Sequence, residues 1–587
     1  MSQPQHGAVM INDRQARFAL WAPGAASVAV ELGNGAIAPL QRTATGWYTA
    51  RIACEAGSAY RFVVDDQLRI PDPASRQQCD DVHGFSRLVD HQSYAWTQHD
   101  WRGRPWHESV ICELHVGLLG GFRGLLDWLP YYQQLGVTAL EFMPIGEFPG
   151  TRNWGYDGAL PFSPDSSYGT PDDLKALIDA AHRHGLMIYL DVIYNHFGPV
   201  GNYLTHYASE FFHDQETTPW GPAIDFRRRE VRDFFIQNAL MWVLDYRIDG
   251  LRLDAVHAIT DHGFVVELAQ RVREAAGPDR HVHLILENEH NTVDLLKSGF
   301  DGQWNDDMHH VIHTILTGED RGYYGSFAED RTEKLQLCLS QGFAYQDGND
   351  KAVQALPPSR FICYLQNHDQ IGNRAFAERL TSLTDESRLW AAAAMLLLSP
   401  MTPMLFMGEE LGSRQPFYFF TDHEPELAEA IREGRRREFG ALFGPNQQTN
   451  ALPDPNDPEI YYASNPYRSA RHHGSPGAAR RPPETPWLRR YRDVLHLRHH
   501  HITPRLPEAR STGARKLGTH AVSAGWRLGD QQLSIDVNLG DEEVPLPHLN
   551  PKAIAEPGSQ LVYAFRADPE RAVLLPGSVM VRLERAA

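Results

Sequence analysis

The sequence has few cysteines, no long apolar run and no excess of positive charge. Five cysteines are scattered over 587 residues, and their odd number fits neither a disulfide framework nor a cysteine-rich zinc site. No stretch of 18 apolar residues occurs, so we predict no membrane-spanning helix. The first residues also lack the basic start and apolar segment of a secretory signal. These absences favour the reducing environment of the cytoplasm.

The net charge of −19 makes nucleic acid an improbable partner, because phosphate binding relies on basic surface. The same charge argues against docking on anionic membranes. Apolar residues make up 42% of the chain and charged residues 22%, which is typical of a globular protein. A chain of this length forms several domains with a sizeable core. A neutral ligand is compatible with all of these properties.

The pattern of apolar residues changes along the chain and predicts three domains. Residues 1–95 contain short alternating strands separated by Gly, Pro and Asp turns, which indicates an N-terminal β-sandwich. Residues 96–505 alternate between strands and helices, with inserted loops near 195–230 and 446–485. Alternating strands return in residues 506–587 and predict a C-terminal β-sandwich domain.

The middle region contains eight apolar runs that read as buried strands. Helical periodicity lies between them, for example in 171–183 and 264–276. Eight such units predict an α/β fold, a (β/α)8 TIM barrel. The runs are Val110–Leu114, Val137–Met143, Leu186–Leu190, Leu251–Leu253, His283–Leu286, Phe300–Trp304, Phe361–Leu365 and Met404–Met407.

Three carboxylates follow the ends of these predicted strands: Asp254, Glu287 and Asp369. In a parallel barrel the carboxyl ends of the strands form the active face, so we expect the three side chains to meet in one cleft. Acids that meet in a cleft favour glycosidic bond chemistry, in which one carboxylate attacks and another protonates the leaving oxygen. The sequence therefore predicts a glycoside-processing enzyme.

Four short motifs contain or flank these acids. They are Asp191–His196, Asp249–His257, Glu287 itself and Asn367–Asp369. In this order, and on these strands, the motifs resemble those of the α-amylase superfamily of glycoside hydrolases and transferases. The resemblance implies that Asp254 is the nucleophile and Glu287 the general acid/base. It also implies that Asp369 binds sugar hydroxyls and favours the distorted transition state.

Elementary electrostatics supports these two main roles. Arg252 lies two residues before Asp254 on the same strand face and can hold that carboxylate in its ionised form. Glu287 follows an apolar strand and lies near two other acids, so we expect its pKa to be raised. A retaining hydrolase needs such a pair, one ionised and one protonated, about 5 Å apart.

The remaining site residues are expected around these acids. Asp191 is expected to give structural support through Arg252, and Tyr156 is expected to stack on the sugar beside the scissile bond. Trp220 is a candidate for the opposite side of that bond. We predict no metal and no cofactor. The substrate-binding candidates are Tyr156, His196, Trp220, Arg252, His257 and His368.

Further stretches resemble one branch of the superfamily, the maltooligosyltrehalose trehalohydrolases. They are Glu113–Gly117, Phe148–Asp157, Leu316–Glu319 with Gly322–Tyr324, and the most specific ones, Gln366–Arg374 and Pro416–His423 with Gly434–Phe439. The resemblance implies cleavage of the α-1,4 bond next to the terminal trehalose unit of maltooligosyltrehalose or a related α-glucan. It also implies a pathway link to a maltooligosyltrehalose synthase. Two alternatives stay open, a glycogen branching enzyme and a non-catalytic glucan-binding protein.

Overall fold

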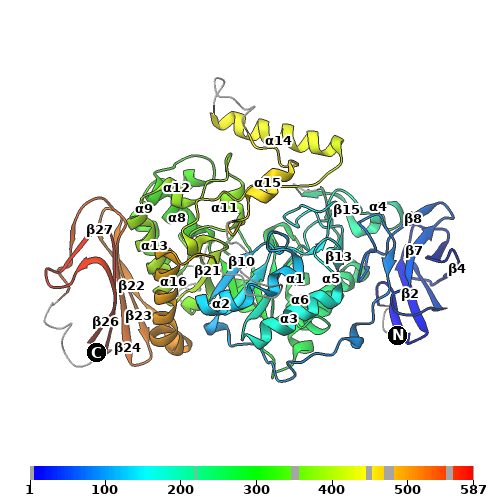
Figure 1. Ribbon diagram of the computed structural model, residues 1–587, viewed down its shortest axis with the longest axis horizontal. Helices are drawn as coiled ribbons and strands as arrows, with labels where there is room; N and C mark the ends of the chain where they lie inside the picture. Colours follow the sequence, from blue (N-terminus) through cyan, green and yellow to red (C-terminus); the bar gives the residue numbers. More distant parts are fainter. Residues whose placement is uncertain are drawn as a thin grey trace.

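A closed barrel of eight parallel strands lies at the centre of the computed structural model (Figure 1). The structure describes residues 5–218, 221–345, 356–443, 452–468, 482–549 and 559–585. Each barrel strand overlaps one predicted apolar run, so the predicted (β/α)8 fold is confirmed. In barrel order the strands are β10 (Ile111–Leu114), β11 (Ala139–Phe142), β14 (Met187–Val192), β17 (Gly250–Leu253), β18 (His283–Leu286), β19 (Gly302–Trp304), β20 (Phe361–Cys363) and β21 (Thr402–Phe406).

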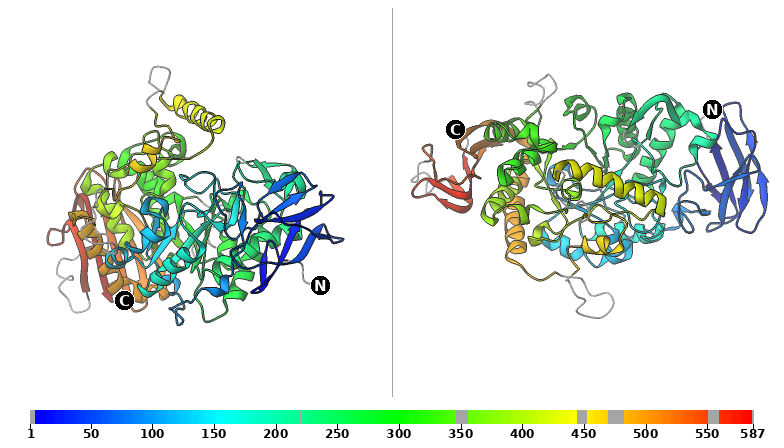
Figure 2. Two further views of the ribbon diagram at one scale, coloured as in Figure 1. Left: turned by 45° about the vertical axis from the view of Figure 1, so that its right-hand side comes forward. Right: turned by 90° about the horizontal axis from the view of Figure 1, so that it is seen from above.

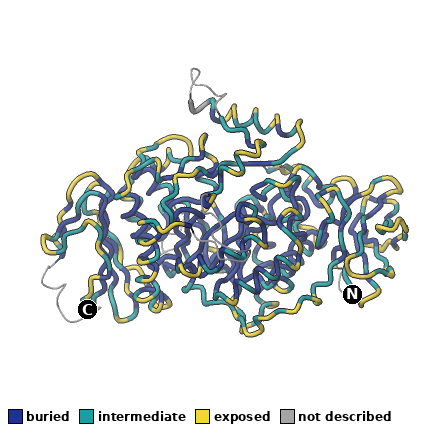
Figure 3. Tube along the Cα trace, viewed as in Figure 1, coloured by how far each residue is buried: buried dark blue, intermediate teal, exposed yellow. Residues whose placement is uncertain are grey.

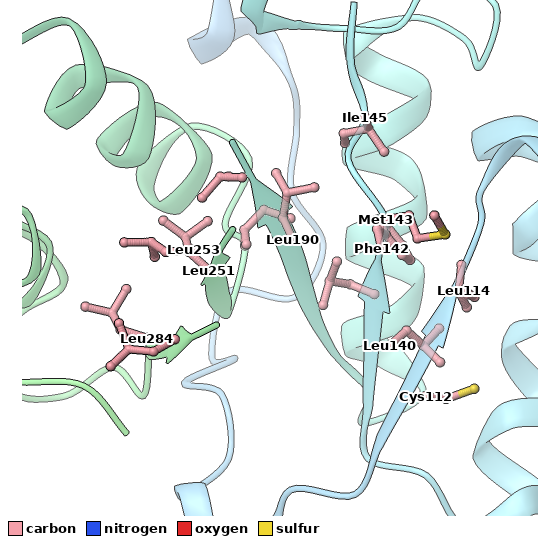
Figure 4. Close-up of a cluster of buried hydrophobic side chains, with 14 of the residues drawn as sticks. Cys112, Leu114, Leu140, Phe142, Met143, Ile145, Leu190, Leu251, Leu253 and Leu284 are labelled. Atoms are coloured by element: carbon pink, nitrogen blue, oxygen red, sulfur yellow. The ribbon is translucent and has the colours of Figure 1, made fainter. Parts of the chain in front are cut away.

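The barrel strands are buried on both faces, which explains their nearly continuous apolar sequence. Alternate residues of a strand point to opposite faces. On β10 and β11 the outward residues, such as Leu114, Leu140 and Phe142, join the apolar layer beneath the helices (Figure 4). Inward residues, such as Ile111 and Ala139, fill the barrel interior. Figure 3 shows this buried zone along the middle of the molecule.

Helices surround the barrel and connect successive strands. Helix α3 illustrates how they begin: the Thr170 side chain accepts a hydrogen bond from the Asp173 amide, and Pro171 occupies the first turn. The apolar face of the helix, including Leu174 and Ile178, is buried. The main helices are α2 (Leu129–Leu135), α3 (Pro171–Arg183), α5 (Arg229–Leu244), α6 (His262–Ala276), α8 (Asp306–Thr317), α9 (Arg331–Gln341), α13 (Glu386–Leu398) and α16 (Pro486–Leu497).

Two antiparallel sheets form the N-terminal part of the chain. They lie at one end of the molecule (Figure 2). They join the barrel through a ring contact between Trp21 and Phe211 and through the Gly24 amide, which donates to the Tyr207 carbonyl at 3.0 Å. One sheet contains β1 (Val9–Asn12), β2 (Gln15–Trp21), β6 (Trp47–Ala53) and β5 (Gln41–Arg42). The other contains β4 (Ile37–Pro39), β3 (Val28–Leu32), β7 (Ala59–Val64), β8 (Leu68–Ile70) and β9 (Ser86–Arg87).

The described C-terminal strands form a six-stranded antiparallel sheet at the opposite end of the molecule (Figure 2). Helix α13 of the barrel packs on this sheet. Trp390 Nε1 donates to the Tyr563 hydroxyl at 2.8 Å, and Arg388 Nε donates to the Leu539 carbonyl at 2.8 Å. The strands are β22 (Ala509–Gly518), β23 (Ala521–Leu528), β24 (Gln531–Asn538), β25 (Val544–Pro545), β26 (Ser559–Asp568) and β27 (Val573–Arg585).

Two excursions leave the barrel on the side where its strands end. The segment after β14 contains the hairpin β15 (Phe212–Thr218) and β16 (Gly221–Ile224). Helix α14 (Pro425–Phe443) projects from the barrel, at the top of Figure 1. No helix in the described part of the chain combines the length and the apolar character that a bilayer crossing needs.

Candidate active site

A cavity of about 490 Å³ opens at the carboxyl ends of the barrel strands, and Asp254, Glu287 and Asp369 all line it. Asp254 directly follows β17, and Glu287 directly follows β18. The prediction that Asp369 follows the end of a strand was wrong, because β20 already ends at Cys363. It belongs to the first turn of α11 (His368–Gly372), which the Asn367 side chain caps by accepting the Asp369 amide at 2.9 Å.

Arg252 joins three carboxyl groups at the floor of the cavity. Its side chain is fully buried. Nη1 donates to Asp191 Oδ2 at 2.6 Å and to Asp254 Oδ1 at 2.8 Å. Nη2 forms an ion pair with Glu287 Oε2 at 2.9 Å. The guanidinium carbon lies 4.0 Å from the centroid of the Trp304 ring, which supports it from one side.

A second donor fixes the carboxyl group of Asp254. Asn195 Nδ2 donates to Asp254 Oδ2 at 2.8 Å and to the Asp254 carbonyl at 2.9 Å. Each oxygen of the carboxyl group therefore accepts a hydrogen bond from a buried side chain, one from Arg252 and one from Asn195. The two bonds fix the orientation of this carboxyl group at the cavity wall.

In the described part of the chain, Glu287 is held through its Oε2 atom. Its Oε2 accepts the Ala255 amide at 2.7 Å besides the ion pair with Arg252. Ala255 adopts a left-handed backbone (φ 41°), which costs an alanine about 1 kcal/mol and directs its amide toward Glu287. Burial raises the pKa of Glu287 well above its usual value, and the charges of Asp254 and Asp369 act in the same direction against Arg252. These effects favour the protonated form of Glu287.

Asp191 is also buried next to Arg252. Burial raises the pKa of Asp191 to about 6, although the adjacent Arg252 opposes this. The Tyr156 hydroxyl donates to Asp191 Oδ2 at 2.6 Å. Asp191 does not line the cavity, so its contacts are with the protein. This placement is compatible with the structural support that we expect from it.

Most of the substrate-binding candidates reach the cavity. Tyr156, His196, His257 and His368 line it, whereas Arg252 lies beneath it. The Tyr156 ring stacks on His368, with centroids 5.1 Å apart. Trp220 lies outside the described residues. No group of three or more His, Cys, Asp or Glu side chains could hold a metal ion in the described ranges.

The comparisons with known proteins agree with this geometry. Residues 88–238 match the family model of the alpha amylase catalytic domain, and residues 509–581 match a domain of unknown function. The malto-oligosyltrehalose trehalohydrolase of Deinococcus radiodurans is 40% identical over 501 residues, which are 82% of this chain and 80% of the relative. The chain belongs to the malto-oligosyltrehalose trehalohydrolase family.

Other similar proteins support the same family assignment. The malto-oligosyltrehalose trehalohydrolase of Saccharolobus solfataricus is 39% identical, over 73% of this chain and 79% of the relative. The crystal structure of a protein from Salmonella typhimurium, assigned to the alpha amylases, superposes with a TM-score of 0.88 at 38% identity and covers 99% of both chains. A branching enzyme of Thiobacillus denitrificans is 32% identical but matches only 41% of this chain and 37% of its own. The chain is a glycosidase.

Several residues that line the cavity were not predicted from the sequence. Tyr323, Tyr324 and Arg374 line it and belong to stretches that resemble the trehalohydrolases. Arg374 forms a bidentate pair with Glu319, at 2.8 and 2.9 Å, which ties two of these stretches together. Their resemblance is the signal that could have marked them as cleft residues. Glu113, buried beneath His368, also stands in such a stretch.

Proposed function

We propose that this enzyme cleaves the α-1,4-glucosidic bond next to the trehalose end of maltooligosyltrehalose, with retention of configuration, and releases trehalose and a maltooligosaccharide. One observation carries the catalytic assignment. A single buried guanidinium is bound to both Asp254 and Glu287, which keeps the two carboxyl groups adjacent at the cavity floor. Retaining glycosidases need two carboxyl groups about 5 Å apart across the scissile bond.

The first step forms a covalent glycosyl-enzyme. A carboxylate oxygen of Asp254 attacks the anomeric carbon of the glucose that adjoins trehalose. Glu287 transfers its proton to the glycosidic oxygen, so trehalose leaves as a neutral alcohol. Arg252 and Asn195 hold Asp254 in place for the attack. The raised pKa of Glu287 favours the protonated form that this transfer needs.

The second step regenerates the enzyme. Glu287, now ionised, accepts a proton from a water molecule, and the resulting hydroxide oxygen attacks the same anomeric carbon. The ester bond to Asp254 breaks, and the maltooligosaccharide leaves with a free reducing end. Asp369 and His368 also line the cavity and bind sugar hydroxyls. The carboxylate of Asp369 also favours the oxocarbenium character of both transition states.

The substrate and the cysteines indicate the cellular context of the enzyme. The substrate carries a trehalose unit at its reducing end, so an isomerising synthase that acts on maltooligosaccharides must precede this enzyme. All five cysteines are free thiols. Free thiols are compatible with a reducing compartment, which we take to be the cytoplasm.

Product analysis on matched substrates tests the proposal. Maltooligosyltrehalose, a maltooligosaccharide of equal length and amylose are incubated separately with the enzyme. We expect free trehalose from the first substrate and much slower hydrolysis of the second. New α-1,6 branches on amylose, without trehalose from the first substrate, would favour the branching-enzyme alternative.

A further inference from the structure

Glu113 is a buried glutamate beside the cavity that the catalytic steps leave without a role. It lies on β10 and is 1% exposed. Its Oε1 contacts His368 Nδ1, and its Oε2 accepts the His368 amide at 3.3 Å. Both oxygens therefore bind the same residue, which lies 255 positions later in the chain.

The other side of His368 faces the substrate cavity. Its Nε2 lies 3.4 Å from Asp369 Oδ1. Tyr156 stacks on one face of the imidazole, and Trp154 meets it edge-on with centroids 5.2 Å apart. These rings prevent the imidazole from turning. The ring therefore connects Glu113, on the protein side, with Asp369 on the substrate side.

We propose that Glu113 is a positioning residue for the hydrolysis: its carboxylate accepts the Nδ1 proton of His368 and so keeps an Nε2–H directed at Asp369 and the neighbouring sugar hydroxyls. Without that negative charge the imidazole would lose a proton more readily, and only one of its two nitrogens would then carry a hydrogen. This inference rests on the proposed function, because it assigns a role within the same site.

The charges around His368 support this arrangement. Burial on its own lowers the pKa of His368, and Arg252 acts in the same direction. The charges of Asp369 and Glu113 outweigh both and raise the pKa to about 9. His368 is therefore an imidazolium at neutral pH, with a proton on each nitrogen. Glu113 supplies one of the two negative charges on which this state depends.

Apart from Arg252, burial favours the uncharged forms of the other titratable groups near His368. Burial lowers the pKa of His115 to about 4 and raises the pKa of Tyr156 well above its usual value. Burial also raises the pKa of Glu141 well above its usual value. None of these groups can replace the negative charge of Glu113.

Glu141 provides a matched control for Glu113. The two glutamates are register partners on the adjacent strands β10 and β11, and both are 1% exposed. Neither carboxyl oxygen of Glu141 has a hydrogen-bond partner among the described residues, whereas both oxygens of Glu113 bind His368. A Glu→Gln substitution at each position therefore distinguishes two effects. Only the change at Glu113 removes a charge in contact with His368, whereas both change the barrel interior.

The test measures substrate binding in a Glu287→Gln background, which removes the titration of the acid/base from the pH profile. The dissociation constant for maltooligosyltrehalose is determined by calorimetry between about pH 6 and pH 9, the range in which His368 titrates. It is compared for Glu287→Gln alone and for double variants with Glu113→Gln, Glu113→Asp and Glu141→Gln.

We expect Glu113→Gln to weaken binding about tenfold as the pH rises from about 6 to 8, because His368 then loses its proton in this range. The parent and the Glu141→Gln variant should keep constant affinity there, and Glu113→Asp should restore part of it. A Glu113→Gln profile that coincides with the parent would overturn the inference. If the unmodified enzyme releases no trehalose, the proposed function fails instead, whatever the binding profiles show.

Discussion

The floor and the rim of the cavity are built in opposite ways. At the floor, Arg252 has no exposed side-chain surface, and its bonds to Asp191, Asp254 and Glu287 stay within the protein. At the rim, Tyr323 is 76% exposed. A floor whose groups already bind one another can fix charges before substrate arrives. A rim of exposed groups is suited to holding sugar rings, so we expect large effects from floor substitutions and small ones from the rim.

The largest effect is expected at the nucleophile. Asp254→Asn keeps the shape of the side chain but removes its nucleophilic charge, so trehalose release should fall by about 10⁴-fold or more. Substrate binding should stay within a few-fold of wild type. Steady-state kinetics and calorimetry measure the two quantities. The control is Asp541→Asn at an exposed carboxylate, and a comparable loss in the control would undermine the comparison.

The second-largest effect is expected at the acid/base, Glu287. Glu287→Gln should reduce hydrolysis of maltooligosyltrehalose by roughly 10³-fold, because the leaving sugar is no longer protonated. With α-maltosyl fluoride the loss should be far smaller in the glycosylation step, since fluoride leaves without a proton. The alkaline decline of kcat/KM, which follows from the raised pKa of Glu287, should vanish in the variant. Equal losses on both substrates would contradict the assignment of Glu287.

Removing the central cation should damage both activity and stability. Arg252→Met leaves the carboxyl groups of Asp191, Asp254 and Glu287 buried without their shared positive charge. We expect about a 10²-fold loss of activity and a loss of about 3–5 kcal/mol in the free energy of unfolding, measured with urea. The control is Arg69→Met at the exposed ion pair with Glu31, where a loss below about 1 kcal/mol is expected. Similar losses of stability at the two arginines would show that the buried Arg252 matters no more to the fold than an exposed arginine.

The raised pKa of His368 predicts that the free energy of unfolding depends on pH. Its pKa of about 9 in the folded protein exceeds the value of 6.5 expected without the fold. The bound proton therefore stabilises the fold fully below about pH 6.5, and this contribution is lost as the pH rises through about 9. It amounts to something on the order of 3 kcal/mol. The difference in unfolding free energy between wild type and His368→Gln should shrink by this order from about pH 6 to above pH 9; a constant difference would show that His368 is not charged.

The smallest effect is expected at the rim. Tyr323→Ala removes an exposed ring from the cavity wall and should raise KM by roughly two- to tenfold without changing kcat, since one sugar contact is worth about 1 kcal/mol. Tyr462 is also exposed but does not line the cavity, so Tyr462→Ala serves as the control. A large fall in kcat for Tyr323→Ala would show that the rim takes part in the chemistry.

The sequence predicts the floor of the cavity better than its surroundings. Strand alternation places Arg252, on β17, and Asp254, directly after it, on the same side, and the structure shows their hydrogen bond. The ion pair between Arg252 and Glu287 was not predicted, because it joins neighbouring strands. The contact of Glu113 with His368 spans 255 positions, and no local pattern could reveal it.

A helix cap explains why Asp369 lies in helix α11 and not at the end of a strand, as the sequence had predicted. The apolar run 361–365 predicts a longer strand than β20, which ends at Cys363. The side chain of Asn367 then accepts amide hydrogens and starts α11, so Asp369 belongs to a helix. Asn is a favoured N-cap residue, but a single Asn after a strand does not reveal this role. The fold could be predicted from periodicity, whereas this backbone path depended on one side-chain contact.

Trapping the covalent intermediate tests the central claim, that the floor of the cavity performs the chemistry, most directly. The enzyme is incubated with a 5-fluoro-α-maltosyl fluoride, digested and analysed by mass spectrometry. We predict one added glycosyl mass on the peptide that contains Asp254, and none in the Asp254→Asn variant. A label on another carboxylate, or inverted products without any label, would contradict the claim.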